Sequence, residues 1–214
     1  MDSLISAVLP GLYLSDIWSL FNIKRLRLLK IDSVLSLYNY PLPSMSIKHK
    51  RISFNRENSK SFFTSGISFI HENRLKNRSV LVNCKDGRNK SVIMVAAYIM
   101  TLTNMSFRNV IRALCRVHRI AQPKDSILKE LKKWLNSHQM TIQRSKFFEE
   151  NSQISFGLER LDKIMMESYL NDIEFYEKFG QYPQDNLPVF LELNLNKLNS
   201  KRLVIPLLIV TPPP

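Results

Sequence analysis

Short apolar runs alternate with amphipathic stretches along the first 140 residues of the chain. The runs have the length and composition of β-strands, and the last of them, SVLVN, is continuous enough to be buried on both faces of a sheet. The strand candidates are residues 11–15, 33–37, 49–54 and 79–83. Apolar residues at helical spacing give helix candidates at 16–30, 60–76, 91–102, after Ser106, and at 126–135. Strands that alternate with helices and then give way to helices predict an α/β domain.

The pattern changes beyond about residue 140. Residues 156–180 predict an amphipathic helix that ends at Gly180. Two strand candidates follow at 189–196 and 202–210, with a polar stretch between them that would allow a hairpin. We therefore divide the chain into a body domain, 1–140, and a C-terminal extension, 141–214. The extension helix could pack on the body, cover its pocket or form a dimer contact.

Charge follows the same division. Residues 1–140 hold 23 Lys and Arg against 8 Asp and Glu, a net charge of +15, whereas residues 141–214 hold 8 against 10, a net charge of −2. A basic body favours anionic partners, among them phosphorylated proteins, inositol phosphates, anionic membrane and RNA, and the alternative is ordinary solubility. A row of arginines on the helix after Ser106 would be a docking face for an acidic partner or a solvated face: Arg108, Arg112, Arg116 and Arg119.

Composition excludes several classes of protein. Hydrophobic residues make up 44% of the chain, enough for a real core, and no apolar stretch has the length of a membrane span. The first fifteen residues lack the basic start and long apolar stretch of a signal peptide. Two cysteines suit a reducing compartment, so we expect a cytoplasmic or nuclear protein. The four histidines have no metal-ligand spacing with these cysteines, so neither a metal nor another cofactor is expected.

The segment LVNCKDGRNKSVIMVAAYIM, which begins at residue 81, places a cysteine and a basic loop between a strand and a helix. A tight loop that ends at a helix start directs backbone N–H groups inward and forms an anion site. The same field favours the thiolate of Cys84, which is the nucleophilic form. Lys85, Arg88 and Lys90 add positive charge around the rim. These features agree with a bound phosphoryl group.

The same segment resembles the signature loop of cysteine-dependent phosphatases, which is His-Cys, five residues, Arg, then Ser or Thr. It resembles the dual-specificity protein phosphatases in particular, over residues 8–136, from LPGLYLS through FFTSGISFIHENRLKNRSVLVNC to QPKDSILKEL. The resemblance implies a central, mostly parallel sheet flanked by helices. It also implies that Cys84 attacks phosphorus and that Ser91 assists breakdown of the phosphocysteine. The loop residues that would surround the phosphate are Lys85, Asp86, Gly87, Arg88 and Asn89.

Three catalytic positions depart from the family pattern. Lys90 stands where the family has an arginine, and it keeps the charge but loses the two-pronged grip on phosphate oxygens. Asn83 stands where the family has the histidine before the cysteine. The aspartate general acid aligns with Asn55 or Arg56, neither of which can protonate a leaving alkoxide, and the adjacent Glu57 could substitute if the loop folds differently.

These departures predict a catalytically impaired dual-specificity phosphatase, a pseudophosphatase that binds phosphorylated Ser, Thr or Tyr in proteins and regulates signalling by competition or as a scaffold. One alternative is an active but slow cysteine phosphatase that uses Cys84, directed at proteins or at phosphoinositides. Another is a basic module for RNA or anionic membrane that reuses the fold.

Overall fold

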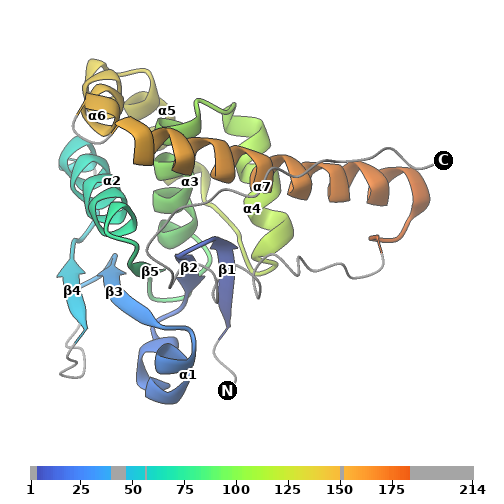
Figure 1. Ribbon diagram of the computed structural model, residues 1–214, viewed down its shortest axis with the longest axis horizontal. Helices are drawn as coiled ribbons and strands as arrows, with labels where there is room; N and C mark the ends of the chain where they lie inside the picture. Colours follow the sequence, from blue (N-terminus) through green and yellow to red (C-terminus); the bar gives the residue numbers. More distant parts are fainter. Residues whose placement is uncertain (1–3, 40–46, 56, 150–151, 184–214) are drawn as a thin grey trace. The chain divides into compact units, whose positions relative to one another are not determined.

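Five strands form one sheet in the computed structural model, which describes residues 4–39, 47–55, 57–149 and 152–183 (Figure 1). They are β1 (Ile5–Leu9), β2 (Leu12–Ser15), β3 (Ile31–Ser36), β4 (Lys48–Arg51) and β5 (Ser79–Asn83), in the spatial order β1-β2-β5-β3-β4. β1 and β2 are antiparallel, and the other three neighbouring pairs are parallel. The expected α/β fold with a mostly parallel central sheet is therefore confirmed.

Helices cover both faces of this sheet. One face carries the short 3₁₀ helix η1 (Trp18–Phe21) and α1 (Ile23–Leu28). The other face carries α2 (Ser59–Leu75), α3 (Lys90–Thr103) and α4 (Phe107–Val117). Around these pack α5 (Asp125–Leu135), α6 (His138–Glu149) and the long α7 (Ser152–Phe179), as Figure 1 shows.

β5 illustrates why the apolar run in its sequence is continuous. Successive side chains of a strand point to opposite faces of the sheet. Val80 and Val82 join the large cluster under α2 and α3, whereas Leu81 joins the smaller cluster under α1. All three are fully buried, so the middle of the strand is apolar on both faces, whereas its first and last residues, Ser79 and Asn83, are polar.

Some local predictions were wrong. The helix expected over 16–30 is broken at Asn22, whose side chain accepts a hydrogen bond from the Arg25 backbone and starts α1 anew. β1 and α6 were not predicted. The strand candidates at 189–196 and 202–210 lie outside the described residues, and the division at residue 140 stays a prediction.

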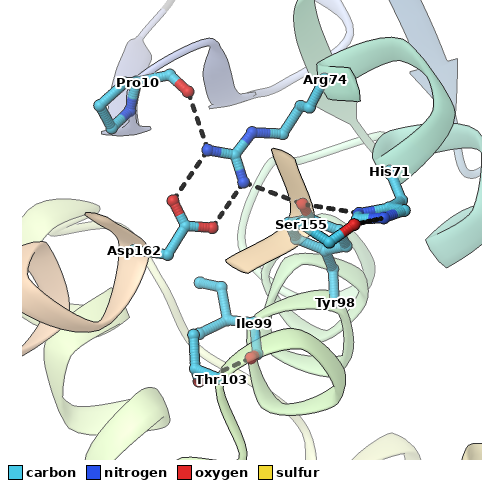
Figure 2. A network of polar contacts seen from close by, with 8 residues as sticks. All are labelled: Pro10, His71, Arg74, Tyr98, Ile99, Thr103, Ser155 and Asp162. Atoms are coloured by element: carbon cyan, nitrogen blue, oxygen red, sulfur yellow. Dashed lines mark hydrogen bonds and ion pairs between the residues drawn. The ribbon is translucent and has the colours of Figure 1, made fainter. Parts of the chain in front are cut away.

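The extension helix α7 packs on the body through a buried ion pair, and Figure 2 shows its surroundings. Arg74 of α2 donates two hydrogen bonds to the Asp162 carboxylate, at 2.5 and 2.8 Å. The same guanidinium donates to the Tyr98 hydroxyl of α3 and to the carbonyl of Pro10, at 2.9 and 3.0 Å. Both charged side chains are almost completely buried, so removing either one would leave the other as a buried charge without a partner.

The arginine row of α4 lies against the acidic side of α7. Arg112 pairs with Glu177 at 2.6 Å, and Arg116 pairs with Asp172 at 3.2 Å. Two of the four arginines are therefore used inside the protein. Basic residues of the body and acidic residues of the extension therefore form ion pairs with each other.

We predict that Asp162→Asn lowers the free energy of unfolding by about 3–5 kcal/mol, because it leaves the buried Arg74 charge without its counter-charge. Denaturant unfolding of the full chain measures this loss. Glu177→Gln is the matched control, since it breaks an ion pair whose glutamate is 61% exposed, and its cost should stay below about 1 kcal/mol. Equal costs for the two variants would show that the buried pair does not hold α7.

His71 makes the stability of the same region depend on pH. Burial, and next the positive charge of Arg74, lower its pKa to about 4. An unfolded chain binds the proton from about pH 6.5 downward, so stability falls as pH drops from 6.5 towards 4, by at most about 3 kcal/mol. We predict that His71→Gln flattens this part of the stability curve. Denaturant unfolding at a series of pH values between 7 and 4 measures this slope, and a slope unchanged in His71→Gln would contradict the prediction.

Candidate functional site

The loop from Cys84 to Ser91 joins β5 to α3 and lies directly against the end of β2. Gly87 has φ of +69°, a region that favours glycine. A Cβ atom added there would come within 2.9 Å of the Asp16 backbone nitrogen and 3.0 Å of the Ser15 carbonyl carbon. Both the backbone conformation and the close approach therefore require glycine at this position.

Cys84 is 2% exposed and faces the interior of the loop. Its sulfur lies 3.1 Å from the Ser91 hydroxyl and donates to the Asp86 carboxylate at 3.4 Å. The same Asp86 oxygen accepts the backbone N–H of Arg88 at 3.0 Å. Ser91 in turn donates to the carbonyl of Gly87 at 3.3 Å. The loop thus brings the predicted nucleophile, the retained serine and an acidic side chain into contact.

Asn83, which stands in the place of the family histidine, forms hydrogen bonds with Ser36 at the end of β3 and with Tyr38, two residues further along the chain. Its side-chain oxygen accepts a hydrogen bond from Ser36 at 2.7 Å, and its amide donates to the Tyr38 hydroxyl at 3.3 Å. Ser36 also contacts the ring of His49 at 2.9 Å. Burial raises the pKa of Tyr38 and lowers that of His49. These hydrogen bonds connect the end of β5 to β3 and to Tyr38. Neither of the two bonds of Asn83 involves the sulfur of Cys84.

The His118 ring connects the loop to β1 through two hydrogen bonds, a role that the sequence did not predict. Its Nε2 lies 2.8 Å from the carbonyl of Gly87, and its Nδ1 lies 2.8 Å from the Ser6 hydroxyl of β1. A carbonyl can only accept, so Nε2 carries the proton and Nδ1 accepts from Ser6. Burial lowers the pKa of His118, which agrees with this neutral form. His118 lies at the end of α4, 31 residues from Gly87, and no sequence motif connects the two positions.

The rim of the loop is held by the segment that precedes α5. The carbonyl of Arg88 accepts the backbone N–H of Gln122 at 2.8 Å, and the side-chain oxygen of Asn89 accepts that of Lys124 at 3.0 Å. Lys85 and Arg88 are exposed, and Lys90 is half-buried as the first residue of α3. Three basic residues therefore lie on the same short loop as the buried Cys84.

In the segment expected to hold a general acid, two asparagines form a turn by bonding to each other's backbone. The backbone N–H of Asn55 donates to the side chain of Asn58 at 2.9 Å, and that of Asn58 donates to the side chain of Asn55 at 2.7 Å. Glu57 is exposed, and Arg56 lies outside the described residues. Asn55 therefore works as a turn-forming residue at the start of α2, and an amide cannot act as a general acid.

Within the described residues, no group of His, Cys, Asp and Glu has the arrangement of a metal site. The search for a helix long and apolar enough to cross a membrane also finds none in that part of the chain.

Comparison with known proteins agrees with this geometry. Residues 13–137 match the family model described as dual specificity phosphatase, catalytic domain. Dual specificity protein phosphatase 15 of Mus musculus is 31% identical over 156 residues, which cover 70% of this chain and 66% of that protein, just under two thirds of its length. Dual specificity protein phosphatase 22 of Homo sapiens is 28% identical over 138 residues, covering 63% of this chain and 75% of that protein.

Solved structures show the same fold. The crystal structure of DUSP15 has a TM-score of 0.63 at 29% identity and covers 68% of this chain and 96% of that one. The crystal structure of PTPMT1 has a TM-score of 0.57 at 20% identity, covering 67% of this chain and 99% of that one, a likeness of fold alone. The strand, the cysteine loop and the helix that follows it lie inside the matched region. The chain belongs to the dual-specificity phosphatase family.

Proposed function

We propose that the protein is a pseudophosphatase, which holds a phosphorylated Ser, Thr or Tyr of a partner protein in its cysteine loop without hydrolysing it efficiently. It would regulate signalling in the cytoplasm or the nucleus, by competing with active phosphatases or as a scaffold. The basic rim of the loop and its inward N–H groups support phosphate binding. The replaced arginine, histidine and general acid support the loss of turnover.

The contact between Cys84 and Asp86 carries the proposal. The thiol donates a hydrogen bond to the Asp86 carboxylate at 3.4 Å, so a negative charge lies beside the sulfur that would attack phosphorus. The carboxylate therefore occupies the approach to the nucleophile and repels the anionic phosphoryl group that the reaction would bring there. A positioned general acid is worth roughly 10²–10⁴-fold in rate, and its loss adds to this effect.

One observation favours the alternative of a slow enzyme. The Ser91 hydroxyl lies 3.1 Å from the Cys84 sulfur, where it can donate a hydrogen bond to a thiolate once a substrate has displaced Asp86. Lys90 would then supply the positive charge for the phosphate oxygens. This enzyme would act on phosphoproteins or phosphoinositides, and the missing acid would cost least with phosphotyrosine, whose phenolate leaves more readily than an alkoxide.

Turnover of an activated aryl phosphate separates the two functions, because its good leaving group makes the missing acid matter least. We predict that the full chain releases phosphate no faster than its Cys84→Ser variant, while both bind a phosphotyrosine peptide in calorimetry. Release that depends on Cys84 would instead establish the slow phosphatase. A chain that neither releases phosphate nor binds the peptide would refute both.

Asp86 should also weaken anion binding, since it occupies the backbone N–H of Arg88 and repels a bound oxyanion. We predict that Asp86→Asn tightens the binding of tungstate about tenfold, the equivalent of about 1–2 kcal/mol for a like charge near the surface. Isothermal calorimetry measures the change. Glu72→Gln removes an exposed acid of α2 and should have no effect. Unchanged affinity in Asp86→Asn would show that the carboxylate does not compete for the loop.

A further inference from the structure

Exposed aromatic, aliphatic and basic side chains gather on η1 and α1, on the sheet face opposite to α2 and α3. We refer to this group as the Trp18 surface, and its residues are Trp18, Phe21, Lys24, Arg27, Leu28 and Lys30. Trp18 is 60% exposed, Phe21 52% and Leu28 80%. Large apolar side chains gathered on one exposed segment mark an interaction site more often than ordinary surface.

The core does not need these side chains. Leu20 of η1 and Leu26 of α1 are fully buried and fill the cluster on this face of the sheet, and Ile23 and Leu29 pack at its edge. Lys24, Arg27 and Leu28 follow the i, i+3, i+4 spacing of a single helix face, which is the face turned away from Leu26. The Trp18 and Phe21 rings lie 6.0 Å apart. The packing of η1 and α1 therefore directs a mixed apolar and basic face outward.

The charge of this segment has one sign. From Ile17 to Ile31 the sequence holds four basic residues and no acid. The two flanking aspartates keep their negative charges, because the hydrogen bonds they accept come from neutral groups: the N–H and hydroxyl of Ser19 for Asp16, and the N–H of Ser79 for Asp32. With both of them included, residues 16–32 still carry a net charge of +2. The Trp18 surface is therefore complementary to an anionic partner.

We propose that the Trp18 surface docks the protein on an anionic membrane. Tryptophan favours the membrane interface, where its ring lies partly in the apolar region and its N–H stays near water. Phe21 and Leu28 would enter the acyl boundary, while lysine and arginine keep their charged ends among the lipid phosphates. RNA would meet the charge but would leave Leu28 in water, and an acidic protein would need an apolar groove shaped to the exposed side chains. A membrane satisfies both kinds of side chain together.

The position of this surface relates it to the phosphate loop. η1 begins two residues after Asp16, whose backbone nitrogen would lie 2.9 Å from a Cβ at Gly87. The η1 end of the surface therefore lies near the loop, whereas α1 leads to Ile31 at the start of β3, the opposite end of the strand from Ser36, which pairs with the Asn83 that precedes the loop. The docking itself does not depend on whether the loop binds phosphate, and the two properties can fail separately.

Sedimentation with vesicles tests the proposal on the full chain. Phosphatidylcholine vesicles with and without phosphatidylserine are compared for the wild type, Trp18→Ser/Phe21→Ser and Lys24→Gln/Arg27→Gln. The controls are Phe156→Ser, which removes a 56% exposed aromatic of α7, and Lys129→Gln, which removes an exposed lysine of α5. Unfolding temperatures confirm that each variant is folded.

We expect the wild type to bind vesicles that contain phosphatidylserine, and added salt to weaken binding. Lys24→Gln/Arg27→Gln should reduce the partition coefficient about 30-fold, since each basic residue near an anionic surface contributes about 1 kcal/mol. Trp18→Ser/Phe21→Ser should reduce it at least tenfold, and the controls should bind like the wild type.

Three results would overturn the proposal. The first is a wild type that shows no preference for phosphatidylserine vesicles. The second is binding that survives both double variants but is lost in Lys85→Gln/Arg88→Gln, which would place the lipid in the loop. The third is self-association of the wild type that Trp18→Ser/Phe21→Ser abolishes, without vesicle binding, which would make the surface a contact between copies of the chain.

Discussion

The close approach of Gly87 to the end of β2 is the constraint on which the candidate site depends. A side chain at this position would collide with the backbone of Ser15 and Asp16, so the loop can close only around a glycine. The closure in turn places the carbonyl of Gly87 between the Ser91 hydroxyl and the His118 ring, which both donate to it. One residue without a side chain therefore fixes the loop to the sheet, to α3 and to the end of α4.

The loop that results has the form of a phosphatase loop, with one of its own carboxylates inside it. Asp86 accepts hydrogen bonds from the Cys84 thiol and from the backbone N–H of Arg88. An anionic ligand that used the same N–H would have to displace this carboxylate. In the proposed function, binding and hydrolysis are therefore separate properties, since binding needs the N–H groups and positive charge, whereas hydrolysis needs in addition a positioned general acid.

The fold could be predicted from the sequence because buried strands appear as short apolar runs of neighbouring residues. The apolar run at β5 and the cap at Ser106, whose hydroxyl accepts the Asn109 N–H, depend on neighbours in the chain. Contacts between distant residues left no such pattern. Arg74 meets Asp162 across 88 positions, and a buried arginine looks like any other basic residue of a helix. His118 likewise gains its role only when the fold brings it under the loop.

The structure shows which of the basic residues have acidic partners on α7. Acids of α7 meet Arg112 and Arg116, so that part of the basic surface of α4 is screened by the protein itself. From Asp16 to Asp32, four basic residues outnumber the two flanking aspartates. A high net charge spread evenly would argue only for solubility. Lys24 and Arg27 lie exposed on the same helix as the exposed Leu28, which supports the proposed membrane partner because a membrane offers both negative charge and an apolar interior.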